Sequence, residues 1–381
     1  MPAASILIKP ASSNCNMDCK YCFYKVLSSN REEYDKGFMS IDTLETLVKE
    51  GIRYADGLLT FAFQGGEPTL AGIDFYKKLI ELQKKYNDKN LIIENTIQTN
   101  GLLIDKEWAQ FLGENHFLVG LSLDGPRKIN DNYRVDYNKN GTFERIMSAI
   151  NYLREYNVDF NILTVVTEEL AGKAGYLYKF YKRNKFEYVQ FIPCMDEVNR
   201  GKECERQKTD APVTALSYGK FLCEIFDLWY DDFMNGDAPD IRMFSNLAQM
   251  AAGYPAEECG MNGCCSCYFV VEGDGSIYPC DFFCTDEWKL GEVGQPFSEL
   301  IQSDKAISFT ENSMTDNEKC KECRHFSLCH GGCRRWREDG TGHEGINRLC
   351  EGYQLFFDHT KDRIMELGKI IIRRMGRPLG V

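Results

Sequence analysis

The segment SSNCNMDCKYCFYK, residues 12–25, carries three cysteines, Cys15, Cys19 and Cys22, in a CxxxCxxC spacing. Three thiolates can bind three irons of a 4Fe-4S cluster and leave the fourth iron open to an exchangeable ligand. A catalytic metal site keeps one coordination position free in the same way. The spacing also suits half of a zinc site that is completed elsewhere in the chain, so it leaves both kinds of metal site open.

From residue 5 to about residue 235, on both sides of this loop, short β-rich runs alternate with longer segments of helical period. The strand-like runs are SILIKPA, LLTFAFQGG, LIIENTIQTNG, FLVGLSLDG, FNILTVVT and YVQFIPC. Repeated βα units predict an α/β fold with a parallel sheet and right-handed crossovers. Six units suit a doubly wound sheet or an incomplete barrel. In either case the cysteine loop follows the first strand, at the edge where parallel sheets form their active sites.

The alternation stops near residue 236, where NGDAP is a candidate linker. The chain beyond it is rich in cysteine and glycine until the amphipathic segment QLFFDHTKDRIMELGKIIIRRM, which predicts a helix. We therefore predict two domains, residues 1–235 and residues 236–381.

Composition limits the possible partners and compartment. The 381 residues carry 45 Lys and Arg against 57 Asp and Glu, a net charge of −12, which would repel a nucleic-acid backbone. There is no basic segment at the start and no apolar run of about 18 residues, so we expect a cytoplasmic protein without a membrane partner. Disulfides seldom persist in that compartment, so the 17 cysteines indicate metal binding or redox chemistry.

The CxxxCxxC loop, with Tyr21 before its last cysteine, resembles the radical S-adenosylmethionine (SAM) superfamily. The resemblance implies a partial (β/α)6 barrel of the radical SAM type. It also implies a 4Fe-4S cluster whose open iron chelates the amino and carboxylate groups of SAM and, once reduced, cleaves SAM to a 5′-deoxyadenosyl radical.

Later strand ends extend this resemblance. QGGEP, residues 64–68, resembles the element that binds the SAM amino group, although the same residues also suit an ordinary turn in which proline opens a helix. Ser122 and Arg134 correspond to contacts with the SAM carboxylate and ribose region, and Met195 to the residue that borders the adenine. The residues to which the resemblance gives a role in SAM binding are Tyr21, Gly65, Gly66, Glu67, Ser122, Arg134 and Met195.

A second group of cysteines has a countable spacing. Nine residues separate Cys265 from Gly275 and four more precede Cys280; CKECRHFSLCHGGC and Cys350 follow. Read alone, these cysteines suit a pair of zinc ribbons. Their pattern resembles the SPASM extension of radical SAM peptide-modifying enzymes, which implies a C-terminal cysteine-rich SPASM domain.

In the SPASM family the ligands of two auxiliary 4Fe-4S clusters interleave. Carried over, the first cluster takes Cys259, Cys265, Cys280 and Cys333, and the second takes Cys320, Cys323, Cys329 and Cys350. Cys264 or Cys267 could replace Cys265, which we choose because it keeps the nine-residue step. Full ligation implies electron transfer and scaffolding. Free thiols are expected at Cys194, Cys204, Cys223, Cys264, Cys267 and Cys284.

The chain from IKPASSNCNMDCKYCFY through FAFQGGEPTLAG and CGMNG to YPCDF and CHGGCRR resembles the anaerobic sulfatase-maturating enzymes. These enzymes oxidise a cysteine or serine of a nascent sulfatase to Cα-formylglycine. The resemblance implies hydrogen abstraction at Cβ, removal of the thiol or hydroxyl proton by Asp281, and loss of one electron through the auxiliary clusters. Tyr24 and Gln64 are placed to line the substrate entrance.

The partners implied are a sulfatase polypeptide or peptide and an electron donor such as flavodoxin or ferredoxin. Because the first strand begins by about residue 5, we expect no leader-peptide recognition domain before it. Two alternatives stay open. A peptide-crosslinking SPASM enzyme would give a product that is lighter by two hydrogens and keeps its sulfur, and a non-enzymatic iron-sulfur or zinc carrier would not cleave SAM.

Overall fold

The computed structural model describes residues 3–195, 211–315, 317–338 and 345–375. The strand-like runs of the first part form neighbouring parallel strands in chain order. These strands are β1 (Ala4–Ile8), β2 (Leu58–Phe63), β3 (Ile92–Thr99), β4 (Leu118–Ser122), β5 (Phe160–Val166) and β6 (Tyr188–Pro193). The predicted βα architecture is therefore confirmed.

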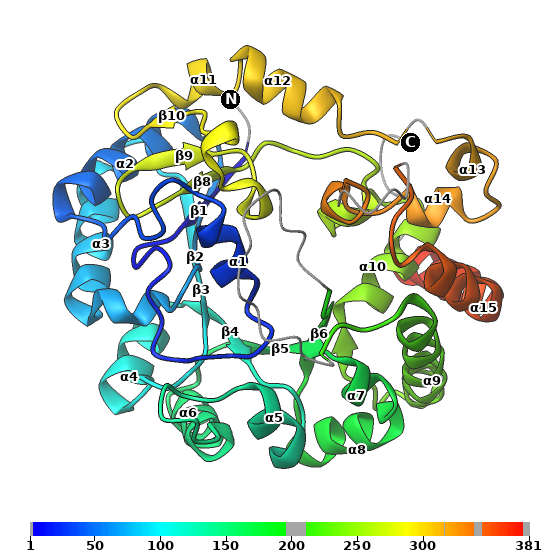
Figure 1. Cartoon of the computed structure of the whole chain (residues 1–381). Coiled ribbons are helices and arrows are strands. Elements are labelled where there is room, and N and C mark those ends of the chain that lie inside the picture. The colour runs from blue at the N-terminus through cyan, green and yellow to red at the C-terminus, as the bar shows by residue number, and fades with distance from the viewer. Residues whose placement is uncertain (1–2, 196–210, 316, 339–344, 376–381) are drawn as a thin grey trace.

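The helices that connect these strands lie outside them and form an incomplete ring in Figure 1. They are α2 (Ile41–Tyr54), α3 (Ile73–Tyr86), α4 (Lys106–Glu114), α6 (Phe143–Glu155), α8 (Ala174–Asn184) and α9 (Ala215–Met234). In α2 the buried residues Leu44, Leu47, Val48 and Ile52 recur at steps of one, three or four. This apolar face packs on the sheet, where burial drives the association of helix and strand. The architecture is a partial barrel.

Burial alternates along β2, where Leu59, Phe61 and Phe63 are buried and the residues between them are half-buried. A side chain added at Gly51 of α2 would meet Leu59 and Phe61, so the buried face is the one that contacts the helices. Alternate side chains of a strand point to opposite faces. The half-buried face, which Gln64 continues, is therefore the inner face of the barrel.

Residues beyond 236 extend both edges of the sheet. At one edge β7 (Asp240–Ile241) pairs with β6, and at the other β8 (Phe269–Val271) lies parallel to β1. Beyond β8 come the antiparallel strands β9 (Ser276–Tyr278) and β10 (Gly291–Glu292). These strands are only two or three residues long, too short to show a period in the sequence. The division at residue 236 stays a prediction, and the sheet continues on both sides of it.

The predicted C-terminal helix is present as α15 (Cys350–Met375), which packs against α9 and α10 (Arg242–Ala251). At the crossing of α9 and α15, Gly219 faces Gly352, and a Cβ at Gly352 would overlap the backbone of Ala215. The absence of side chains lets the two backbones approach, which fastens the last helix to the barrel.

The remaining elements are short. The α-helices are α1 (Phe23–Ser29), α5 (Arg127–Tyr133), α7 (Glu168–Ala171), α11 (Phe297–Leu300), α12 (Asp304–Glu311), α13 (Glu318–Lys321) and α14 (Phe326–Cys329). The 3-10 turns are η1 (Pro68–Ala71), η2 (Cys259–Met261), η3 (Asp281–Phe283), η4 (Asp286–Trp288) and η5 (Arg334–Trp336). Across the part of the chain that the structure describes, no helix combines the length and apolarity needed to span a bilayer.

Candidate active site

The three cysteines of the first loop lie between β1 and α1, at the carboxyl end of the strand. All three are half-buried. The pKa of Cys15 and of Cys19 is raised to about 12, chiefly by burial, with smaller contributions from the Glu67 charge at Cys15 and from neighbouring thiols of the loop at both. A cysteine that binds metal must be a thiolate. Positive charge from bound iron would therefore be needed to stabilise Cys15 and Cys19 in the deprotonated form.

The glycine-rich turn after β2 is hydrogen-bonded to the cysteine loop. Gly66 N donates to Ser12 O at 2.9 Å, and Glu67 N donates to Asn14 O at 2.7 Å. A Cβ at Gly66 would overlap the carbonyl group of Asn14. Glycine is therefore required at position 66 by the approach of the cysteine loop itself, a reason that the motif alone does not reveal.

The Glu67 carboxylate is 1% exposed and accepts hydrogen bonds from the hydroxyls of Thr69 and Thr99 at 2.6 and 2.7 Å. It also accepts from Asn100 N at 2.8 Å. Burial raises the pKa of Glu67, and these donors oppose that effect. Asn100 in turn donates to Asn16 Oδ1 at 2.7 Å and reaches Cys15 Sγ at 3.8 Å. The Glu67 side chain thus links the ends of β2 and β3 to the cysteine loop.

Tyr21 and Arg134 meet at a residue that the sequence analysis missed, Asp124. Arg134 Nε lies 3.0 Å from Asp124 Oδ2, the Tyr21 hydroxyl donates to the same oxygen, and the guanidinium lies 5.6 Å from the centre of the Tyr21 ring. Burial would lower the pKa of Arg134, but the charges of Asp124 and Tyr21 raise it, so the guanidinium stays protonated. Its charge lowers the pKa of Cys19 against the effect of burial. Asp124 follows β4 in SLDG, a polar residue at a strand end, which was the available signal.

The other residues predicted to contact SAM also lie at carboxyl ends of strands. Ser122 is the last residue of β4 and Met195 lies two residues beyond β6, and both are buried.

Asp281, Tyr24 and Gln64 form one hydrogen-bonded group although they are far apart in sequence. The Tyr24 hydroxyl donates to Asp281 Oδ2 at 2.7 Å and accepts from Gln64 Nε2 at 2.8 Å. Gln64 Nε2 also lies 3.3 Å from Asp281 Oδ2. Asp281 opens η3 directly after Cys280, and Tyr24 is two residues beyond Cys22. The group therefore lies between the first cysteine loop and the second cysteine region.

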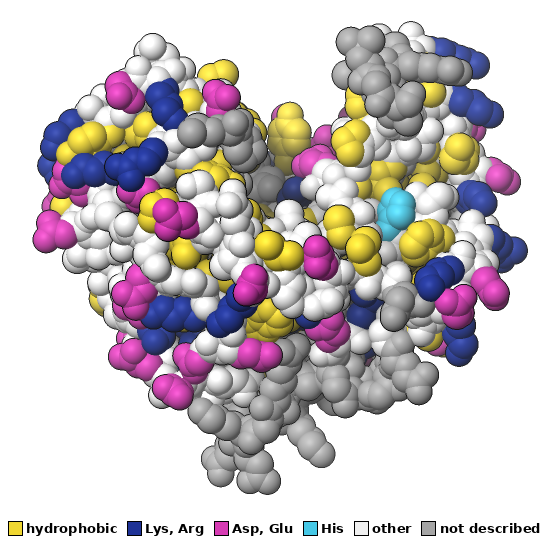
Figure 2. Space-filling view, turned by 90° about the horizontal axis from the view of Figure 1, so that it is seen from above, with side chains coloured by type: hydrophobic (Ala, Val, Ile, Leu, Met, Phe, Trp, Pro, Cys, Tyr) yellow, Lys and Arg dark blue, Asp and Glu magenta, His cyan; other side chains and the backbone are white. Residues whose placement is uncertain are grey.

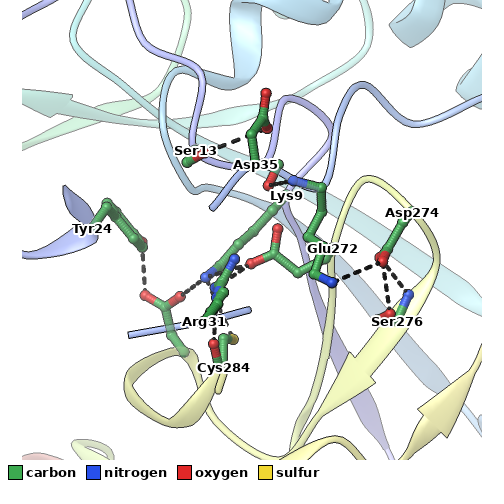
Figure 3. Close-up of polar contacts among 12 residues, drawn as sticks. Lys9, Ser13, Tyr24, Arg31, Asp35, Glu272, Asp274, Ser276 and Cys284 are labelled. Carbon is green, nitrogen blue, oxygen red and sulfur yellow. Dashed lines mark hydrogen bonds and ion pairs between the residues drawn. The ribbon is translucent and has the colours of Figure 1, made fainter. Parts of the chain in front are cut away.

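The other oxygen of Asp281 contacts a buried lysine, Lys9, which the sequence analysis also missed. Lys9 Nζ lies 2.7 Å from Asp281 Oδ1 and 3.3 Å from Glu272 Oε1. Arg31 pairs with the same oxygen of Glu272 at 2.7 Å. Burial would lower the pKa of Lys9, but the charges of Asp281, Cys284 and Glu272 raise it above its usual value. Figure 3 shows Lys9, Arg31 and Glu272 converging at the centre of the view, with Tyr24 to the left.

The cysteines of the second region influence one another in two sets. The pKa of Cys333 is raised to about 12, chiefly by burial and in part by the thiols of Cys259 and Cys265. Burial likewise raises the pKa of Cys280, and the Cys333 thiol adds to this rise. The Cys333 thiol thus interacts electrostatically with the other three cysteines of the first predicted quartet.

The second set contains the cysteines of the second predicted quartet. The pKa of Cys329 is raised to about 12, chiefly by burial and in part by the thiols of Cys350, Cys320 and Cys323. By contrast, burial alone raises the pKa of Cys267. The Cys267 thiol in turn raises the pKa of Tyr54, a residue outside both quartets. Cys204, expected to be a free thiol, lies outside the described residues.

The donors of the cysteine loop and of both sets are thiols, which fits iron-sulfur clusters held by cysteine thiolates. Among the described side chains, no group of three or more His, Cys, Asp or Glu is arranged to hold a single metal ion.

The face shown in Figure 2 is hollowed between two parts of the molecule, and hydrophobic and acidic side chains lie along the rim.

Comparison with known proteins places these features in a family. The Radical SAM superfamily profile matches residues 10–172, and an iron-sulfur cluster-binding domain profile matches residues 261–324. The chain is 44% identical to the cysteine-type anaerobic sulfatase-maturating enzyme of Clostridium perfringens strain 13, over 97% of this chain and 100% of that enzyme. It is 32% identical to the serine-type enzyme of Bacteroides thetaiotaomicron, over 93% of this chain and 89% of that enzyme.

Solved structures agree with the sequence comparisons. The structure described as native anSMEcpe with bound AdoMet and Cp18Cys peptide matches with a TM-score of 0.90 at 44% identity, over 97% of this chain and 100% of that one. Streptococcus suis SuiB bound to S-adenosylmethionine matches with a TM-score of 0.64 at 19% identity, over 92% and 77%, which shows a shared fold. Because the Clostridium perfringens enzyme is matched at 44% identity over its full length, the chain belongs to the anaerobic sulfatase-maturating enzymes of the radical SAM superfamily.

Proposed function

We propose that this protein oxidises a cysteine of a sulfatase polypeptide to Cα-formylglycine, with Asp281 as the general base. The observation that carries the proposal is the contact of Asp281 with Tyr24 and Gln64, which joins the first cysteine loop to the second cysteine region. The higher identity to the cysteine-type relative, 44% against 32% for the serine-type relative, favours cysteine as the target residue.

The proposed cofactors are SAM and three 4Fe-4S clusters. Cys15, Cys19 and Cys22 would hold the first cluster, and the two quartets of the second region would hold the others. Bound SAM, cleaved reductively, would supply the radical that removes a hydrogen atom from Cβ of the target. An electron donor of the flavodoxin or ferredoxin class would supply the reducing electron.

The chain's own residues would direct the proton and the substrate. Tyr24 and Gln64 hold Asp281 Oδ2 at the inner face of the barrel, where the oxygen can accept the thiol proton of the target cysteine. The target loses a hydrogen atom, a proton and one electron, which gives a thioaldehyde. Water then hydrolyses the thioaldehyde, which gives formylglycine and releases hydrogen sulfide.

A peptide experiment tests this function directly. Reduced, reconstituted protein with SAM should convert a peptide spanning a sulfatase target cysteine into an aldehyde in which oxygen replaces sulfur and two hydrogens. The aldehyde should form a hydrazone, and a peptide with alanine at the target position should remain unchanged. A product that is lighter by two hydrogens, keeps its sulfur and forms no hydrazone would instead identify a crosslinking enzyme.

The assignment of Arg134 and Ser122 to SAM gives a further prediction. Replacing either residue with alanine should weaken SAM binding by about 1.5–3 kcal/mol, the usual value of a hydrogen bond to a charged group. Peptide affinity should stay nearly unchanged, because neither residue belongs to the Asp281 group. Arg134→Lys, which keeps a cation beside Asp124, is the matched control for folding, because breaking a buried ion pair is itself destabilising. Equal SAM affinity in both alanine variants and the parent, measured by equilibrium dialysis, would contradict the assignment.

A further inference from the structure

Lys9 is fully buried at the end of the first strand, where a lysine is seldom found without a specific partner. It follows β1 directly, and its backbone N–H donates to Val271 O at 2.8 Å. Because Ile8 is paired with Val271 in the parallel ladder, the next residues of the two strands, Lys9 and Glu272, emerge side by side. The pairing of β1 with β8 thus brings Lys9 to the part of the chain that carries Asp281.

Four buried charges meet at this point and balance one another. Lys9 and Arg31 are the cations, and Glu272 and Asp281 are the anions, with side chains between 1% and 5% exposed where an ion pair records them. Arg31 also donates from Nε to Cys284 O at 2.6 Å, so it is held independently of Asp281. Glu272 therefore has its own cation, and the shorter of the two Lys9 contacts is the one to Asp281, 2.7 Å against 3.3 Å.

We propose that Lys9 is a positioning residue for the reaction, and that it fixes the Asp281 carboxylate by binding Oδ1 so that Oδ2 faces Tyr24, Gln64 and the target thiol. This inference rests on the proposed role of Asp281 as the base. The Lys9 stem contributes to the same rigidity, because it packs where a side chain at Gly65 would lie, and Nζ lies 4.9 Å from the centre of the Tyr24 ring.

Glu272 already has a cation in Arg31, which lies 2.7 Å from Glu272 Oε1, so charge balance at Glu272 does not by itself require Lys9. A lysine that served only to neutralise Glu272 would not need to reach Asp281.

The test separates hydrogen abstraction from proton removal. Lys9→Met keeps the length of the side chain and removes the charge. With a target peptide deuterated at Cβ, the variant should still transfer deuterium to 5′-deoxyadenosine, because hydrogen abstraction does not need the base. Formylglycine formed per deoxyadenosine should fall by about a hundredfold, the usual effect of misplacing a catalytic group by about 1 Å. The KM for the peptide should change little while kcat falls.

Three companion variants distinguish positioning from charge balance. Lys9→Met combined with Glu272→Gln restores local neutrality, so the double variant should fold as the parent does. It should still be uncoupled, which means that it forms little formylglycine per deoxyadenosine. Glu272→Gln alone keeps the Lys9–Asp281 pair and should form product at nearly the parent ratio. Lys9→Arg keeps a cation and should recover part of the lost activity. If Lys9→Met does not fold, the comparison is made with the double variant.

The outcomes against the inference are equally specific. Parent-like coupling in the double variant would show that Lys9 only balances charge, and would overturn the proposal. Asp281→Asn is measured in parallel, so that the base and its positioning residue can be judged separately. Loss of product in Asp281→Asn with normal coupling in the Lys9 variants would refute only this inference, whereas normal product in Asp281→Asn would refute the assignment of the base.

Discussion

Formylglycine production by the Asp281→Asn variant should fall by at least about a hundredfold, within the 10² to 10⁴ that a single general base contributes. Asparagine keeps the shape of the side chain and can still accept the Tyr24 hydrogen bond, but it cannot take up the thiol proton. The variant should therefore bind its clusters and cleave SAM at nearly the parent rate. Deoxyadenosine and formylglycine are measured in the same reaction, so that the ratio reports the loss of the base.

A matched control is available five residues farther along the chain. Asp286 accepts a hydrogen bond from Glu32 N at 2.7 Å, and an asparagine there can accept the same bond. Asp286→Asn should leave the ratio of formylglycine to deoxyadenosine unchanged. Product formation by Asp281→Asn at nearly the parent rate, with iron content intact, would show that this aspartate has only a structural role next to Cys280.

Iron content should separate the first cluster from the other two. The assigned thiolates number three in the first loop and eight in the second region, which predicts about twelve irons in three 4Fe-4S clusters after anaerobic reconstitution. Replacing Cys15, Cys19 and Cys22 together with alanine should leave about eight irons and abolish SAM cleavage, because the open iron is lost with the first cluster. Iron and zinc are quantified by elemental analysis of the same samples.

Single alanine variants of neighbouring cysteines serve as controls for the second region. Cys264→Ala and Cys267→Ala should keep all of the iron, whereas Cys265→Ala should lose cluster one. If Cys264→Ala lost iron and Cys265→Ala did not, the ligand would be the neighbour. Zinc in the second region, or only about four irons in the intact protein, would contradict both auxiliary clusters.

The local pattern of the sequence was sufficient to predict the βα units and to single out the cysteine groups. Strand and helix periods persist over five or more residues in β1 to β6 and in α2, α3, α4, α6 and α8, so hydrophobic spacing alone predicts each unit. The CxxxCxxC loop is local as well, because the spacing of its three cysteines is itself the signal. The strands β7 to β10 escaped prediction because two or three residues carry no period.

The contacts around the base were decided by tertiary structure. Tyr24, Gln64 and Asp281 were predicted one by one, but sequence separations of 257 and 217 residues say nothing about their meeting at one carboxylate. Lys9 reads in the sequence as one polar residue at the end of an apolar run, and Glu272 as part of a turn. Only the parallel pairing of β1 with β8 aligns them, because strand register places side chains that no local period relates. The sequence by itself therefore determined the βα units and the candidate ligands, and the pairing of distant strands determined which charges hold the proposed base.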